Sequence, residues 1–159
     1  MLRLAGYDVV FQEIPGEVTL ALNLSGCPNR CPGCHSPHLR SEIGEALDEE
    51  LCAELLLRYG EAVTCVCFMG GDGDPAAVRE LSARFRDRTG GRLRTGWYSG
   101  RTALPPGVEA QDFDYIKLGP YVEELGGLDR ESTNQRLYRI VDGEWIDITD
   151  RFRRNRDRM

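Results

Sequence analysis

The sequence lacks the features that would place the protein in a membrane or send it out of the cell. None of its apolar runs approaches the roughly 20 residues that a membrane-spanning helix needs. Its first residues, MLRLAGYDVVFQEIPGEV, hold one arginine but neither a long apolar stretch nor a small-residue cleavage site. We therefore expect a cytoplasmic protein that has no membrane partner.

The sequence also lacks the excess of positive charge that is typical of general nucleic-acid binders. Its net charge is −6, which argues against a nucleic-acid partner. The basic side chains gather at the C-terminus, where RFRRNRDRM (151–159) holds five arginines and one aspartate. Neither a phosphate-binding loop nor an evident carboxylate pair with a histidine for acid–base catalysis is present.

Long Pro/Gly/Ser-rich linkers are missing as well, so we expect one domain over residues 1–150 followed by a basic tail over 151–159. The apolar and charged contents, 41% and 29%, are ordinary for a globular protein. Alternating or apolar runs predict strands, and leucine spacing with Pro and Gly boundaries predicts helices. The expected strands are 17–26, 62–69, 92–100 and 113–119, the helices 45–60 and 75–90, and a hairpin 137–149.

Strands that alternate with helices predict an α/β fold with a mostly parallel sheet. Such folds place their chemistry in loops at the carboxyl ends of the strands. A closed eight-stranded barrel takes about 250 residues. A chain of 159 residues is therefore expected to form only part of one.

Six cysteines are present, and three of them lie close together in SGCPNRCPGCHSPH (25–38). Cys27, Cys31 and Cys34 have the spacing CxxxCxxC and follow the first predicted strand. Since we expect a reducing compartment, a metal or a cluster is a better explanation for these thiols than disulfide bonds.

Three arrangements would use these cysteines. A zinc ion would take all three and either His35 or His38, in a zinc-stabilised interaction module. A redox pair would use Cys31 and Cys34 and leave the third cysteine without a role. A four-iron cluster would be held at three irons, and its fourth iron would be open to bind a substrate or cofactor.

The motif CxxxCxxC resembles the signature of the radical S-adenosylmethionine (SAM) superfamily. FMGGDGD (68–74) resembles the superfamily's GGE-type motif, and WYSG (97–100) resembles its aromatic–polar–Gly turn. SGCPNRCPGCH and DYIKLGPYVEELGGLDRESTNQRLYRI (114–140) are similar to the activating proteins of anaerobic ribonucleoside-triphosphate reductase. The resemblance covers roughly residues 15 to 140.

The resemblance implies a small incomplete βα barrel of radical SAM type with a mostly parallel sheet. It implies one [4Fe-4S] cluster held by Cys27, Cys31 and Cys34, with SAM at the open iron. The residues expected at SAM are Gly33, Cys34, His35, Gly70, Gly71 and Asp72.

The activity implied by the resemblance is that of a radical SAM oxidoreductase that activates a glycyl-radical enzyme. The 5′-deoxyadenosyl radical would abstract hydrogen from a glycine in the large subunit of anaerobic ribonucleotide reductase. The electron would come from a donor such as flavodoxin or ferredoxin. An activase of another glycyl-radical enzyme and a small-molecule radical SAM enzyme are the alternatives within this superfamily.

Three further residues carry open alternatives. Cys65 and Cys67 share one face of a predicted strand, where they are either small buried apolar residues or a dithiol that relays reducing equivalents. Lys117, the sole lysine, is either an ordinary strand-end residue or a contact to SAM.

Overall fold

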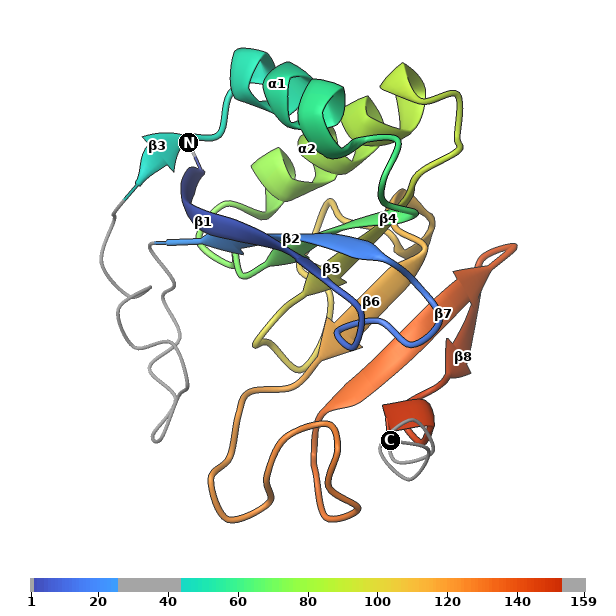
Figure 1. Ribbon diagram of the computed structural model, residues 1–159. Helices are drawn as coiled ribbons and strands as arrows, with labels where there is room; N and C mark the ends of the chain where they lie inside the picture. The colour runs from blue at the N-terminus through green and yellow to red at the C-terminus, as the bar shows by residue number, and fades with distance from the viewer. Residues whose placement is uncertain (1, 26–43, 153–159) are drawn as a thin grey trace.

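The computed structural model describes residues 2–25 and 44–152. Its centre is one eight-stranded sheet with the strand order β3-β1-β2-β4-β5-β6-β7-β8 (Figure 1). The strands are β1 (Arg3–Val10), β2 (Thr19–Leu24), β3 (Glu45–Ala46), β4 (Cys65–Met69), β5 (Arg94–Tyr98), β6 (Tyr115–Leu118), β7 (Arg136–Val141) and β8 (Glu144–Asp147). The helices are α1 (Glu49–Tyr59), α2 (Pro75–Arg88) and the short 3₁₀ turn η2 (Ala110–Asp112).

Four consecutive strands of the sheet, β2, β4, β5 and β6, run parallel to one another. The outer strands pair antiparallel: β1 with β2 and β3 on one side, and β7 with β6 and β8 on the other. The sheet is open, because β3 and β8 are its two ends. The expected incomplete βα barrel with a mostly parallel sheet is therefore wrong: the fold is a mixed sheet with two helices in the described residues.

A missing crossover helix accounts for the antiparallel strands that follow β6. Between β6 and β7 the chain holds Gly119 and Pro120, whereas β5 and β6 are parallel although no α-helix lies between them. Proline and glycine disfavour a crossover helix, and a parallel return needs a crossover of a dozen residues or more, usually helical. After β6 the strands consequently return by turns and pair antiparallel.

The helix α2 begins at Pro75 as predicted, whereas α1 begins four residues after its predicted start at 45, because residues 45–46 form β3. The Asp48 side chain accepts a hydrogen bond from the Leu51 amide at 2.9 Å and caps α1, and Gly60 follows the last turn. Asp74 caps α2 in the same way, through the Ala77 amide at 3.3 Å, and Pro75 occupies the first turn.

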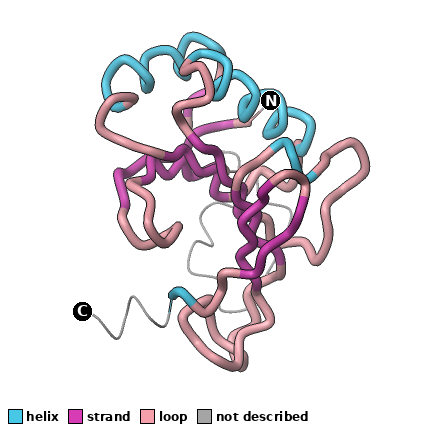
Figure 2. Tube along the Cα trace, turned by 90° about the vertical axis from the view of Figure 1, so that its right-hand side faces the viewer, coloured by secondary structure: helices cyan, strands magenta, loops and turns pink. Residues whose placement is uncertain are grey.

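Both helices cover the same face of the sheet (Figures 1 and 2). Their buried residues, among them Leu55, Val78 and Phe85, pack with Phe68 and Trp97 of the sheet. A second, smaller cluster lies on the opposite face and contains no helix residue; it consists of Ile14, Cys65, Cys67, Tyr115, Leu137 and Ile148. The sheet therefore separates two apolar layers, and α1 and α2 cover only one of them.

The four predicted strands, both helices and the C-terminal hairpin are confirmed, within a few residues at each end. The strands β1 and β3 and the turn η2 were not predicted. Neither described helix has the length and apolar character that crossing a membrane requires. Of the predicted basic tail, residues 153–159 lie outside the described residues.

Candidate functional site

The four parallel strands end side by side at one edge of the sheet. Asn23, Met69, Tyr98 and Lys117 form a row across β2, β4, β5 and β6, each in register with the next. We call this edge the carboxyl edge, because the chain leaves each of these strands there. The loops that follow it begin at Ser25, Gly70, Ser99 and Gly119, so the glycine motif and the turn at 97–100 meet at this edge, and the chain leaves β2 for the cysteine motif there.

The cysteine motif belongs to the first of these loops. Cys27, Cys31 and Cys34, together with Gly33 and His35, lie outside the described residues. The two ends of that segment are placed on β1: the Ser25 amide donates to the Arg3 carbonyl at 3.0 Å, and the Arg3 guanidinium donates to the Gly44 carbonyl at 3.2 Å. Ser25 and Gly44, which flank the segment, therefore both bind Arg3.

The glycine motif lies against the end of β2, where the cysteine segment begins. Gly70 and Gly71 have φ values of +104° and +88°, which disfavour any residue with a Cβ. A Cβ on Gly70 would lie 3.3 Å from the Leu24 carbonyl oxygen, and a Cβ on Gly71 would lie 2.7 Å from Val78 Cγ2. These glycines are therefore needed by the fold itself, and they lie against Leu24, the last residue of the strand that leads to the cysteine segment.

The Gly70 backbone is also tied to β5. Its amide donates to the Tyr98 carbonyl at 3.1 Å, and its carbonyl accepts from the Trp97 indole N–H at 2.7 Å. Since Trp97 is fully buried, the glycine loop is fixed to the core by a side chain that cannot move without repacking.

Asp72 is buried, with 2% of its surface exposed, and it joins the β4 loop to the β5 loop. Its carboxylate accepts from the Ser99 hydroxyl at 2.6 Å and from the Gly100 amide at 2.9 Å. The Arg101 guanidinium donates to the Asp72 carbonyl at 3.4 Å. The contact of Asp72 with SAM stays a prediction. In the structure, the Asp72 side chain joins the loop after β4 to the loop after β5.

Lys117 makes the corresponding connection between the β5 and β6 loops. Its Nζ donates to the Ser99 carbonyl at 3.1 Å and to the Gly119 carbonyl at 2.9 Å, and it lies 5.9 Å from the centre of the Tyr98 ring. The sequence leaves Lys117 as either a strand-end residue or a contact to SAM, and it does not predict this connection. Its two carbonyl partners depend on how two loops fold back, which no local pattern signals.

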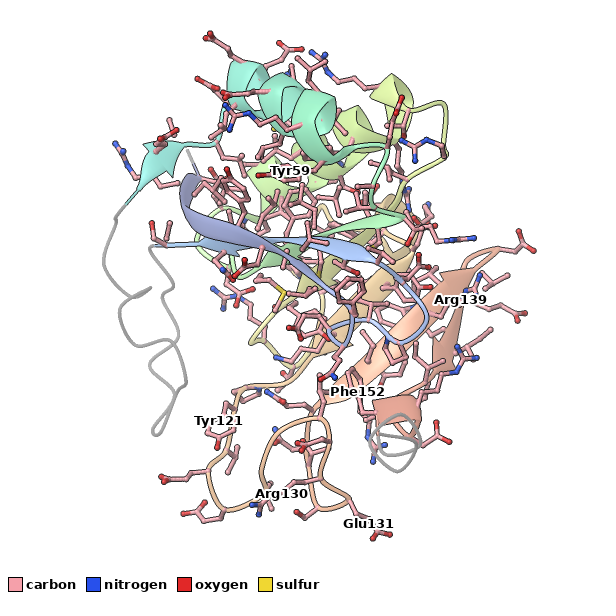
Figure 3. The ribbon with its side chains drawn as sticks, viewed as in Figure 1. Tyr59, Tyr121, Arg130, Glu131, Arg139 and Phe152 are labelled. Atoms are coloured by element: carbon pink, nitrogen blue, oxygen red, sulfur yellow. The ribbon has the colours of Figure 1, made fainter. Side chains whose placement is uncertain are left out.

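The loop from 119 to 135 is fixed to the same edge and extends away from the helices, as the labelled Tyr121 and Glu131 show (Figure 3). The Asn134 amide donates to the Pro120 carbonyl at 3.0 Å, and the Gln135 amide donates to the Gly119 carbonyl at 3.4 Å. Asn134 and Gln135, which lie in the segment 114–140, therefore close this loop at its base.

Several titratable groups near the helix-free face have raised pKa values. Burial raises the pKa of the Cys65 and Cys67 thiols, and it raises the pKa of the Glu13 carboxyl and of Tyr98. Protonated thiols are poor nucleophiles and poor metal ligands, which favours the apolar role of Cys65 and Cys67 over a dithiol relay.

The donor set fits an iron–sulfur cluster with an open corner. Three thiols in one short segment supply three of the four ligands that a four-iron cluster takes. Within residues 2–25 and 44–152, no group of three or more His, Cys, Asp or Glu side chains is arranged to hold a metal ion. No known protein family, no curated protein and no solved structure matches this chain.

Proposed function

We propose that this protein is a radical SAM activase that forms the glycyl radical of a partner enzyme. The observation that carries the proposal is the position of the glycine loop at the end of β2, the strand that leads to the cysteines. The segment with Cys27, Cys31 and Cys34 begins one residue beyond the end of β2, and Gly70 and Gly71 pack against the end of that strand. A cluster and its SAM would need the cysteine and glycine loops to lie close together.

The three cysteines would hold a [4Fe-4S] cluster, and the Gly70–Asp72 loop would receive SAM beside it. The bound cluster and SAM together would supply one-electron cleavage of the sulfonium, and so a carbon radical able to take hydrogen from a glycine Cα. The chain itself would bind and orient SAM. Positive φ values at Gly70 and Gly71 and the absence of a Cβ there let a ligand approach the backbone closely.

The rest of the carboxyl edge suits a site that must be rigid before SAM arrives. Asp72 and Lys117 tie three successive loops together through buried hydrogen bonds. Preformed geometry lowers the entropy lost on binding and holds the reacting atoms at the required separation. The open sheet places no barrel wall around this edge, which leaves room for a segment of another protein to enter.

The protein substrate we propose is the large subunit of anaerobic ribonucleotide reductase, with flavodoxin or ferredoxin as the electron donor. This choice rests on the similarity of residues 25–35 and 114–140 to the activating proteins of that enzyme. The mixed sheet differs from the partial barrel that the same similarity implied. The proposal therefore rests on the cysteine segment and the strand-end loops, and not on the overall fold.

The test is anaerobic reconstitution with iron and sulfide, followed by reduction, addition of SAM and quantification of 5′-deoxyadenosine. We expect the intact protein to bind about four irons per chain and to release the nucleoside. Cys31→Ala is expected to abolish release. Cys52→Ala is the matched control, since this cysteine is buried in α1 and the pKa of its thiol is raised to about 11 by burial; this variant is expected to keep the activity.

Each alternative gives a different result. A colourless protein that holds one zinc and leaves SAM intact would overturn the proposal in favour of a zinc-stabilised interaction module. An iron protein that cleaves SAM but forms no radical on the reductase subunit would instead indicate another glycyl-radical enzyme or a small-molecule substrate.

A further inference from the structure

Lys117 is a buried cation that binds the backbone of two loops. Only 8% of its surface is exposed, and its ammonium group donates to two backbone carbonyls, those of Ser99 and Gly119. Hydrogen bonds from a charged donor are stronger than neutral ones and contribute more when water is excluded. The sole lysine of the chain therefore fixes the loop after β5 to the loop after β6.

Ser99 connects this lysine to the loop that carries the glycine motif. While the Ser99 carbonyl accepts from Lys117, its hydroxyl donates to Asp72 at 2.6 Å. The Gly100 amide, next along the chain, donates to the same carboxylate at 2.9 Å. Asp72, Ser99 and Lys117 thus form one continuous polar connection across the loops after β4, β5 and β6. All three residues are buried.

We propose that Lys117 is a positioning residue, which acts through Ser99 and Asp72 to hold the Gly70–Asp72 loop in the geometry that binds SAM. The identity of the ligand rests on the proposed function. The connection itself is a property of the protein without any cofactor. Lys117 acts through the backbone: the described contacts of its ammonium are carbonyls that belong to the loops.

The matched control lies on the same strand and the same face. Tyr115 is two residues before Lys117, and its hydroxyl donates to the Glu17 carboxylate at 2.6 Å at the opposite edge of the sheet. Tyr115→Phe removes one buried hydrogen bond from β6 without touching the carboxyl edge. Lys117→Met removes the ammonium and keeps most of the side-chain length.

The first measurement is amide hydrogen exchange of the protein without cofactor. In Lys117→Met we expect exchange of the Gly100 amide to accelerate about tenfold or more, because its loop opens more readily. In Tyr115→Phe we expect the same amide to change by less than about threefold. Ser99→Ala, a small change that keeps the carbonyl, is expected to accelerate Gly100 as Lys117→Met does, and it serves if the lysine variant fails to fold.

The second measurement is equilibrium binding of SAM to the anaerobically reconstituted protein with the cluster oxidised, so that no SAM is cleaved. We expect Lys117→Met to weaken binding about tenfold and Tyr115→Phe to change it by less than about twofold. Equal weakening in both variants, or accelerated exchange with unchanged binding, would show a purely structural lysine and overturn the inference.

The two measurements also separate this inference from the proposed function. If the wild-type protein binds no SAM, the proposed function fails, and the role toward SAM fails with it. Exchange at Gly100 then still decides whether Lys117 holds the loops. Unchanged exchange in Lys117→Met, alongside normal SAM binding by the wild type, would overturn the positioning role alone.

Discussion

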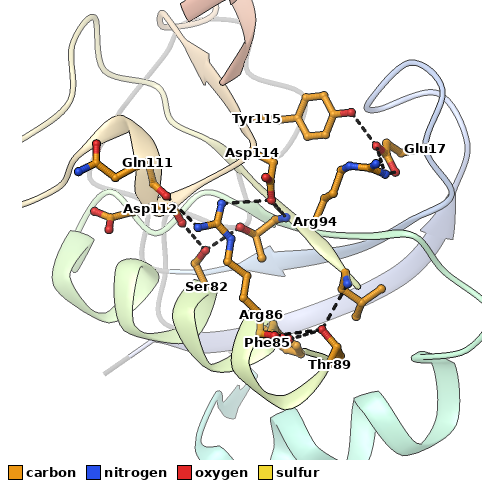
Figure 4. A network of polar contacts seen from close by, with 12 residues as sticks. Glu17, Ser82, Phe85, Arg86, Thr89, Arg94, Gln111, Asp112, Asp114 and Tyr115 are labelled. Carbon is orange, nitrogen blue, oxygen red and sulfur yellow. Dashed lines mark hydrogen bonds and ion pairs between the residues drawn. The ribbon is translucent and has the colours of Figure 1, made fainter. Parts of the chain in front are cut away.

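The two edges of the parallel strands use their buried polar groups differently. At the amino edge, where β2, β4, β5 and β6 begin, side chains mostly bind one another. The Glu17 carboxylate accepts from the hydroxyls of Thr64 and Tyr115, each at 2.6 Å, and pairs with Arg94 at 3.2 Å (Figure 4). At the carboxyl edge, Asp72 and Lys117 bind mainly the backbone of loops.

The amino edge also joins the sheet to α2. Asp114 accepts from the Thr95 amide at 2.9 Å and pairs with Arg86 of the helix at 3.1 Å, while Ser82 Oγ lies 2.7 Å from Thr95 Oγ1 (Figure 4). Such contacts connect α2 to the sheet. The same helix also holds the turn η2, because the Ser82 hydroxyl donates to the Asp112 carbonyl at 2.7 Å and the Arg86 guanidinium donates to the Gln111 carbonyl at 2.8 Å.

The difference between the two edges indicates at which edge we expect a ligand to bind. A closed set of side-chain contacts, as around Glu17, stabilises the layers. Backbone-directed contacts, as around Lys117, keep glycine loops in one shape without filling the space beside them. In βα barrels the functional residues lie at the carboxyl ends of the strands, and the opposite face contributes stability. We propose the same division for this mixed sheet.

The largest effect is expected when a glycine of the carboxyl edge gains a side chain. Gly71→Ala would combine an unfavourable φ of +88° with a Cβ only 2.7 Å from Val78 Cγ2. We expect a loss of about 3–4 kcal/mol in the free energy of unfolding, measured by urea denaturation of the cofactor-free protein. Gly90→Ala is the control at the amino side: its φ is +59°, and nothing lies within 4 Å of its Cβ.

For the control we expect a loss of about 1 kcal/mol. Equal losses in the two variants would mean that packing at Leu24 and Val78 does not define the glycine loop. The packing of Gly71 on Leu24 would then no longer support the proposed site.

A smaller effect separates the two buried carboxylates. Glu17→Gln is expected to lower the free energy of unfolding by about 2 kcal/mol, because one amide group cannot accept from all of its donors. SAM binding should stay as in the wild type. Asp72→Asn is expected to lower stability by about 1–2 kcal/mol and also to weaken SAM binding, measured by equilibrium dialysis. Weakened SAM binding in Glu17→Gln would abolish the proposed distinction between the edges.

The smallest effect concerns Glu13 and pH. Burial raises the pKa of this carboxyl above its ordinary value of 4.5, so the folded protein holds the proton more tightly than the unfolded chain. The stability that comes from this proton is present below pH 4.5 and is lost as the pH rises through the folded pKa. Glu13→Gln should therefore gain stability relative to the wild type between about pH 4.5 and 7, seen in urea unfolding at several pH values. Parallel profiles for the two proteins would contradict this assignment.

The elements of the fold were largely predictable, but their assembly was not. Leucine spacing around Leu51 and Leu55, the glycine and proline boundaries of α2 and the Asp142-Gly143 turn are local signals, and each gave the right element. The antiparallel outer strands arise because glycine and proline replace a crossover helix after β6. β1 was not predicted because seven of its eight residues are half-buried or exposed, in a mixed pattern that has no clean alternation.

The candidate site shows the same limit. The motif at Gly70–Asp72 was predicted from sequence, and it does lie beside the end of the strand that leads into the cysteines. The joining of loops by Asp72, Ser99 and Lys117 was not predicted, because residues at positions 72, 99 and 117 meet only when three strands align in register. The register between strands that are distant in sequence depends on the whole sheet, so a short stretch of sequence does not predict it.

The most direct test of the account is the electron paramagnetic resonance spectrum of the reconstituted, reduced protein, recorded with and without SAM. We predict the signal of a reduced four-iron cluster, with g values that change when SAM is added, and loss of the signal in Cys31→Ala. A protein without that signal, or a signal that SAM leaves unchanged, would contradict the claim that the carboxyl edge holds a cluster with an iron open to SAM.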